Sequence, residues 1–165
     1  MKQMIRNLMR RFGWDLVRLD QDVFGKDPLN DMSKFLITDS PIVFDIGANV
    51  GQSINMFRSR FPKSMIHSFE PSPSTFETLS REASGLKDVK LWNFALGSES
   101  GQMRLLENSQ SVMSSFLHLS EFGWGNLTKE TLVDVKTVDD FCNDEKIEKI
   151  DILKSDTQGF DLEVF

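Results

Sequence analysis

The stretch VFDIGANVGQ, residues 43–52, decides the fold of this chain. It begins with a run of β-branched and aromatic residues, which is typical of a buried strand, and continues through Gly47 and Gly51, four positions apart. Asp45 stands inside the apolar run, where a carboxylate costs free energy unless another group pairs with it. A strand, a glycine-containing turn and a helix in this order predict a ligand site at the carboxyl end of the strand.

Strands and helices alternate outward from this stretch. Apolar runs rich in β-branched and aromatic residues predict further strands, and apolar residues at helical spacing predict the helices between them. The predicted strands are 42–46, 65–70, 89–96 and 149–156, and the predicted helices are 53–61, 72–85, 137–144 and a last one that begins near residue 159. This order predicts an α/β fold with a Rossmann-like, doubly wound, mostly parallel sheet in a three-layer αβα arrangement.

Two regions depart from this alternation. The segments 100–108 and 131–138 alternate apolar and polar residues, so we expect a β insertion after the third predicted strand. Residues 1–40 are expected to form a helical lead-in to a domain that comprises residues 41–165. Residues 1–20 place basic and apolar residues at helical spacing, which favours a helix packed on its own domain; peripheral contact with a membrane or a partner is the alternative.

Composition and charge argue against several classes of protein. The formal net charge of -6 disfavours a broad nucleic-acid-binding surface. No continuous apolar run is long enough to predict a transmembrane helix. The single cysteine, Cys142, cannot form an internal disulfide, and no cysteine–histidine cluster predicts a metal site. These features together predict a cytoplasmic protein without a bound metal.

The loop after the first predicted strand indicates the kind of ligand. Its sequence DIGANVG, residues 45–51, differs from the GxGxxG fingerprint of dinucleotide-binding folds. A carboxylate at Asp45 would disfavour a pyrophosphate and attract a cationic ligand, and Glu70 ends the second strand, where an acid binds ribose hydroxyls. These residues favour S-adenosylmethionine over a dinucleotide, and an NAD-dependent oxidoreductase is the less favoured alternative.

Five segments in order resemble the motifs of the FkbM-type methyltransferase family. They are VFDIGANVGQS (43–53), SFEPSPSTFETL (68–79), NFALGSESG (93–101), TVDDF (137–141) and IDILKSDTQGFDLEVF (150–165). The resemblance implies a class I methyltransferase that uses S-adenosylmethionine. It also implies O-methylation, with a hydroxyl group of a saccharide or a similar small metabolite as the acceptor.

The same resemblance implies which residues form the site. The methionine end of the cofactor would lie against Asp45 and the loop through Gly51, Glu70 would hold the ribose, and the turn after the third strand would lie near the adenine. Asp156, at the end of the fourth strand, would face the methyl group and the acceptor. The cofactor-binding residues so predicted are Asp45, Gly47, Ala48, Asn49, Gly51, Glu70, Asn93, Ala95 and Asp156.

Lys154 and Asp156 are the candidates for the chemistry. They stand two positions apart on the fourth predicted strand, so their side chains are expected to leave the same face. Asp156 would orient or deprotonate the acceptor hydroxyl, while Lys154 would tune Asp156 or neutralise developing charge. A simple ion pair between the two is the structural alternative. His67 is expected in the core, and three serines are expected either to shape the acceptor side or to form a flexible turn: Ser111, Ser114 and Ser115.

The resemblance also implies that the sheet gains strands beyond Phe165. The fourth predicted strand would then be an exposed edge in this chain. We therefore expect a fragment, an oligomer that covers this edge, or a non-catalytic cofactor-binding or partner module left by truncation.

Overall fold

The computed structural model describes residues 24–117 and 124–165. The chain consists of two compact units, Met1–Phe35 and Leu36–Phe165. The predicted helix over residues 1–20 lies outside the described residues. The predicted site residues all belong to the second unit.

One short helix, α2 (Pro28–Ser33), lies among the described residues of the first unit. Its first turn is stabilised by Asp27, whose carboxylate accepts a hydrogen bond from the Asn30 amide at 3.1 Å, and by Pro28, which suits the first helical position. The carboxylate of Asp31 is buried and accepts a hydrogen bond from the Gly25 amide at 2.5 Å. Local capping therefore accounts for this helix.

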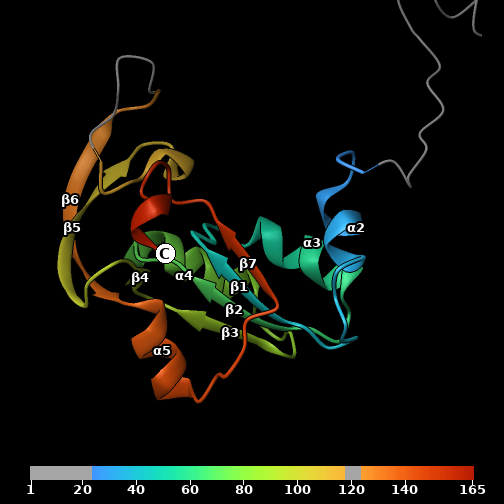
Figure 1. Ribbon diagram of the computed structural model, residues 1–165. Coiled ribbons are helices and arrows are strands. Elements are labelled where there is room, and N and C mark those ends of the chain that lie inside the picture. Colours follow the sequence, from blue (N-terminus) through green and yellow to red (C-terminus); the bar gives the residue numbers. More distant parts are fainter. Residues whose placement is uncertain (1–23, 118–123) are drawn as a thin grey trace, which may run out of the picture. The chain divides into compact units, whose positions relative to one another are not determined.

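The second unit is built on a parallel sheet, here called sheet A (Figure 1). Its strand order is β3-β2-β1-β7, and each adjacent pair is parallel. The strands are β1 (Ile42–Ile46), β2 (Met65–Phe69), β3 (Val89–Trp92) and β7 (Ile152–Ser155). A parallel sheet with these crossovers confirms the predicted Rossmann-like α/β fold.

Helices cover sheet A on both faces. The three helices are α3 (Gln52–Arg60), α4 (Pro73–Glu82) and α5 (Val138–Glu145). On one face, Phe141 of α5 packs against the rings of Phe44 and Phe69, with centroid distances of 5.5 and 4.9 Å. On the other face, Ser53 of α3 donates a hydrogen bond to Asp45. Because successive strand residues point to opposite faces, these contacts confirm the three-layer arrangement (Figure 1).

The predicted β insertion forms a second sheet, sheet B, with strand order β4-β6-β5. Its strands are β4 (Ala95–Leu96), β5 (Gly101–Asn108) and β6 (Leu127–Lys136), and a short 3₁₀ helix, η1 (Ser111–Met113), follows β5. β5 and β6 pair antiparallel over most of their length, and β4 pairs parallel with β6. Figure 1 shows β5 and β6 of sheet B on the left of the view.

The single strand predicted over residues 89–96 is wrong. The chain leaves sheet A after Trp92 and joins sheet B at Ala95. The physical reason is Asn93, whose side-chain amide donates hydrogen bonds to the carbonyl oxygens of Glu70, at 2.8 Å, and Pro71, at 3.1 Å. These bonds stabilise a turn where the apolar pattern predicted a continuous strand.

The predicted helix beginning near residue 159 is also wrong. The described chain forms only a short 3₁₀ helix there, η2 (Asp161–Glu163). The carboxylate of Asp161 accepts hydrogen bonds from the amides of Thr157, at 2.9 Å, and Gly159, at 3.2 Å. Gln158 and Gly159 have φ values of 56° and 97°, so the chain turns through the left-handed region where an α-helix would have to begin.

Candidate functional site

A cavity of about 320 Å³ lies at the carboxyl ends of β1, β2 and β7. Its walls come from the loop after β1, the turn after β2, strands β4 and β5, the segment from η1 to Phe116, and the residues that follow β7. The carboxyl ends of parallel strands meet at one edge of a sheet, and ligands of doubly wound folds bind there. The volume is at the lower end of the range for small-molecule sites.

The loop after β1 lies close to two other segments of the main chain. The amides of Gly47 and Ala48 both donate to the carbonyl oxygen of Phe69 at 3.0 Å. Gly47 has a φ of +73°, and a Cβ at this position would come within 2.2 Å of the Asp156 carbonyl oxygen. Only glycine fits this position, which holds the loop against the end of β7.

Gly51 lies behind the loop, next to the helices, and its predicted contact with the cofactor stays a prediction. It precedes α3 with a φ of +94°, and a Cβ there would meet Leu79 of α4 at 3.0 Å. The residues that line the cavity include Gly47, Ala48 and Asn49, whereas Gly51 is not among them. Gly51 therefore lets the helices pack closely and orients the loop from behind.

Glu70 lies at the cavity wall with 7% of its surface exposed. Its carboxylate accepts hydrogen bonds from the amide of Asn49 at 3.0 Å and from the amide of Ser72 at 2.9 Å. Burial raises the pKa of Glu70 to about 7, although these two backbone hydrogen bonds act in the opposite direction. Two accepted bonds leave a carboxylate with lone pairs for further donors, such as a pair of hydroxyl groups.

Asp45 lies beneath the cavity and is fully buried. One of its oxygens accepts a hydrogen bond from Ser53 Oγ at 2.5 Å, and the other lies 3.0 Å from Lys154 Nζ. Residues Asp45 and Lys154 are direct partners in the β1–β7 register. Asp45 is not among the residues that line the cavity. Its predicted contact with a ligand stays a prediction, and Oδ1 has no hydrogen-bond partner within the protein.

The alternative prediction, an ion pair between Lys154 and Asp156, is wrong, because the partner of Lys154 is Asp45. Lys154 pairs with Asp45 across the strands, because β7 ends at Ser155 and Asp156 lies beyond the ladder. The structure nevertheless brings Lys154 and Asp156 to the same cavity, as expected for residues at one strand end. Asp156 is exposed there, and its Oδ1 accepts a hydrogen bond from Gln158 Nε2 at 2.8 Å.

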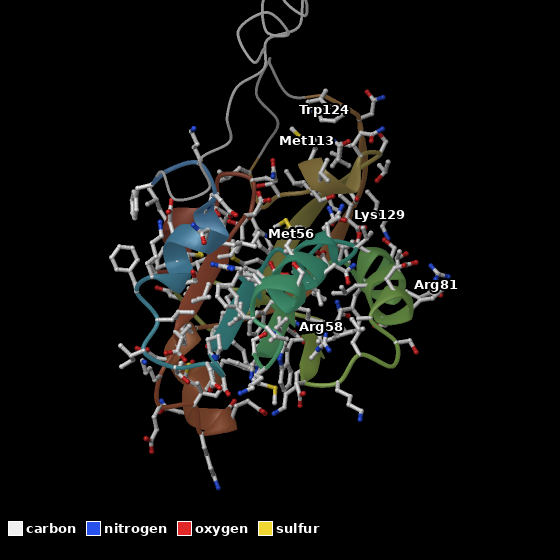
Figure 2. All side chains as sticks on the ribbon, turned by 90° about the vertical axis from the view of Figure 1, so that its right-hand side faces the viewer. Met56, Arg58, Arg81, Met113, Trp124 and Lys129 are labelled. Carbon is white, nitrogen blue, oxygen red and sulfur yellow. The ribbon has the colours of Figure 1, made fainter. Side chains whose placement is uncertain are left out.

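The segment around η1 forms part of the cavity wall. Ser111 Oγ donates to Asn49 Oδ1 at 3.1 Å, and Ser115 Oγ donates to the Gln158 carbonyl oxygen at 3.0 Å. Met56 of α3 also lines the cavity. In Figure 2, Met56 lies between Arg58 of the same helix and Met113 of η1. The serines that the sequence singles out, Ser111, Ser114 and Ser115, all line the cavity.

Three other residues that the sequence singles out are Asn93, Ala95 and His67. Asn93 does not line the cavity, and its amide group instead supports the turn that carries Glu70, whereas Ala95 does line it. His67 is buried, as predicted, and accepts a hydrogen bond from Trp92 Nε1 at 3.3 Å. Burial, aided by the nearby Lys90 charge, lowers the pKa of His67 to about 4, so the ring is neutral at pH 7.

Sequence reasoning missed most of the apolar wall. Its members include Phe69, Leu96, Leu105 and Phe116. In the sequence these residues are indistinguishable from core residues, since both kinds follow the strand period. Gln52, which follows the loop after β1, carried a detectable signal because it begins a helix beside the expected site.

Within residues 24–117 and 124–165 no three side chains of the metal-binding types His, Cys, Asp and Glu gather in a suitable group. None of the helices in these ranges combines the length and the apolar character needed to cross a bilayer.

Comparison with known proteins identifies the family. The model of the methyltransferase FkbM domain matches residues 45–165. The chain belongs to this family. The match begins at Asp45 and includes the loop, Glu70 and the residues after β7, so the FkbM domain contains the whole wall of the cavity described above.

Several curated relatives carry methyltransferase names. The 2-O-methyltransferase NoeI of Sinorhizobium fredii is 26% identical over 135 residues, which cover 75% of this chain and 56% of the relative. Methyltransferase 1 of Beauveria bassiana is 27% identical and is covered to 61%, with 84% of this chain aligned. Methyltransferase sdnD of Sordaria araneosa is 29% identical and is covered to 59%, with 76% of this chain aligned. The chain thus spans somewhat more than half the length of these relatives.

A solved structure shows the same fold. The FkbM methyltransferase from Methylobacillus flagellatus superposes with a TM-score of 0.51 at 18% identity, over 80% of this chain and 30% of that one. At this level of identity the likeness supports the α/β fold.

Proposed function

We propose that this FkbM domain is an S-adenosylmethionine-dependent methyltransferase that methylates a hydroxyl group of a saccharide or a similar small metabolite. The observation that carries the proposal is the cavity at the carboxyl ends of β1, β2 and β7, with a glycine loop and a buried carboxylate in its wall. Family membership and the name of one relative, a 2-O-methyltransferase, support both the reaction and the hydroxyl acceptor. A cytoplasmic location belongs to the same proposal.

The residues of the cavity fit the three parts of this cofactor. The apolar wall formed by Phe69, Leu96 and Leu105 suits the adenine ring, beside Ala95. Glu70 can accept hydrogen bonds from the ribose hydroxyls with the lone pairs that its two backbone donors leave free. The loop from Gly47 to Asn49 and the Lys154 ammonium form a polar corner for the amino-acid end.

The bound cofactor would supply a methyl group on a sulfonium centre, which is the electrophile of the reaction. The protein's own part is to position the acceptor and remove its proton, since in-line displacement depends strongly on alignment. Asp156 is the side chain that we assign to this step. It is exposed, lines the cavity and carries a carboxylate whose Oδ1 is oriented by Gln158 Nε2.

The acceptor would enter from the side of η1. Ser111, Ser114 and Val112 lie there, and Met56 faces them from α3. Hydroxyl groups beside apolar side chains suit a small hydroxylated metabolite, because such a molecule presents both kinds of surface. This part of the wall is therefore where we place the acceptor.

The test is methyl transfer from labelled S-adenosylmethionine to pools of hydroxylated acceptors, with products identified by mass spectrometry. We expect label in an O-methyl product with the wild-type chain and a loss of about a hundredfold or more in Asp156→Asn. Asp139→Asn, on the surface of α5, is the matched control and should retain activity. Cofactor binding without transfer to any acceptor pool would refute the catalytic assignment and favour a non-catalytic binding module.

A further inference from the structure

The corner of the cavity below the loop after β1 has an unexpected charge arrangement. Asp45 is fully buried: Oδ2 accepts a hydrogen bond from Ser53 Oγ at 2.5 Å, whereas Oδ1 has no hydrogen-bond partner and lies 3.0 Å from Lys154 Nζ as an ion pair. A buried carboxylate requires such partners because an unpaired one costs several kcal/mol. The charge that this corner presents to a ligand is therefore not that of Asp45.

Lys154 is the side chain that reaches the cavity from this corner. It lines the cavity with 26% of its side chain exposed, and its Nζ also donates to the Gly47 carbonyl oxygen at 3.2 Å. An ammonium group has three N–H donors, so the hydrogen bond to Gly47 and the ion pair with Asp45 leave at least one donor for a ligand. Its geometry is held by Asp45 across the β1–β7 ladder, where the two residues are register partners.

The other charged side chains in the wall have the opposite sign. Glu70 and Asp156 are the acidic groups, and among the described residues that line the cavity Lys154 is the cation. Among the described residues of the wall, a carboxylate of a ligand can therefore form an ion pair with Lys154 alone. The amino-acid end of S-adenosylmethionine carries such a carboxylate.

We propose that Lys154 binds the carboxylate of the cofactor's amino-acid end, and that Asp45 is a positioning residue that holds the Lys154 ammonium at the cavity. The inference rests on the proposed use of S-adenosylmethionine. It assigns Lys154 to recognition of the cofactor in place of the part in catalysis that its sequence position predicts. It also makes Asp45 act through Lys154 and not through direct contact with the ligand.

The experiment compares S-adenosylmethionine with its decarboxylated form, which lacks only the carboxylate, by calorimetric titration. The wild-type chain should bind the carboxylate-bearing form about ten- to a hundredfold more tightly, the range for a hydrogen bond between charged groups. Lys154→Met should bind the two forms about equally. Lys63→Met, which changes an exposed lysine paired with Asp39, should keep the wild-type ratio.

A second pair of variants separates the assignment from a folding defect, since Lys154→Met leaves the Asp45 carboxylate buried without a cation. Asp45→Asn combined with Lys154→Met removes both charges, and we expect a folded protein with equal affinity for the two forms. Asp45→Asn alone keeps the ammonium but removes the ion pair that positions it, so this variant should still prefer the form with a carboxylate, by a smaller ratio than the wild-type chain.

Each outcome has a distinct meaning. Equal binding of both forms by the wild-type chain, or an unchanged ratio in the double variant, would overturn the assignment of Lys154 while leaving the proposed function intact. An equal loss of affinity for both forms in Asp45→Asn would instead indicate that Asp45 contacts the ligand ammonium, and would also overturn it. Failure of the wild-type chain to bind either form would overturn the proposed function and this inference together.

Discussion

Cofactor affinity is expected to depend on pH through Glu70. Burial raises the pKa of this carboxyl to about 7, so the group is about one-tenth ionised at pH 6 and about nine-tenths ionised at pH 8. An ionised carboxylate accepts hydrogen bonds from both ribose hydroxyls, whereas the protonated form loses acceptor capacity. If the ionised form is the one that binds, affinity for S-adenosylmethionine rises about tenfold between pH 6 and pH 8, equivalent to about 1.4 kcal/mol.

The assay is calorimetric titration with S-adenosylmethionine at pH 6, 7 and 8. Glu70→Gln should bind S-adenosylmethionine more weakly, and its affinity should lack the pH dependence that the Glu70 carboxyl contributes. Any titration of the cofactor itself affects both proteins equally and cancels when they are compared. Glu77→Gln, an exposed position on α4, is the matched control and should retain the wild-type dependence. Equal pH dependence in the wild type and in Glu70→Gln would refute the reasoning.

The same group has a consequence for stability. Between about pH 4.5 and about pH 7 the folded chain keeps a proton on Glu70 that the unfolded chain has released. The free energy of unfolding contributed by this group should therefore fall as pH rises through this window, by up to about 3 kcal/mol in total. Urea unfolding should show this decline in the wild-type chain and a flatter profile in Glu70→Gln.

Three further substitutions test the fold around the site. Gly47→Ala should destabilise the chain by about 2 kcal/mol or more in urea unfolding, because a Cβ would meet the Asp156 carbonyl oxygen at 2.2 Å. The control Gly85→Ala, at a residue with φ +80° and open space around it, should cost about 1 kcal/mol, and equal costs for the two variants would contradict the close approach at Gly47. Phe141→Ala should cost about 3–5 kcal/mol by the same measurement, since the ring is 1% exposed at the centre of the aromatic core, and a cost below about 1 kcal/mol would contradict the packing. Glu107→Gln should lower the free energy of unfolding at pH 7 by about 1–3 kcal/mol. Burial by itself would raise the pKa of Glu107, but hydrogen bonds from Thr131, Ser72 and Lys129 keep this pKa below its usual value. The stability that the carboxylate contributes is therefore lost as pH falls below about 4.5, and the difference between the variant and the wild-type chain should vanish in acid.

Local signals in the sequence predicted much of the fold correctly. Ser72 accepts a hydrogen bond from the Thr75 amide and Thr137 accepts one from the Asp140 amide, and these caps stand at the first residues of the predicted helices 72–85 and 137–144. The strand of the opening stretch likewise depends on neighbouring residues, and the parallel pairing of the strands follows from the alternation of strands and helices. Such features depend on residues that are close together in the sequence.

The errors arose where one side chain forms hydrogen bonds with main-chain groups that the apolar pattern of the sequence does not reveal. Asn93 ends the third strand by binding carbonyl oxygens of the preceding strand–helix turn, and Asp161 binds amides that a helix would have used. Asp45 was recognised as unusual from its place in an apolar run, but its partner Lys154 belongs to a strand more than a hundred positions later. The pairing depends on the β1–β7 register, which a single sequence does not display.

The central claim, that this cavity binds S-adenosylmethionine, is tested most directly by NMR of the isotope-labelled chain during titration with the cofactor. We expect saturable shifts of the backbone amides of Gly47, Asn49 and Glu70, while the amides of Asn143 and Lys149, beyond the far end of the sheet, stay unchanged. Saturable shifts confined to the second group, or none anywhere up to millimolar cofactor, would contradict the account.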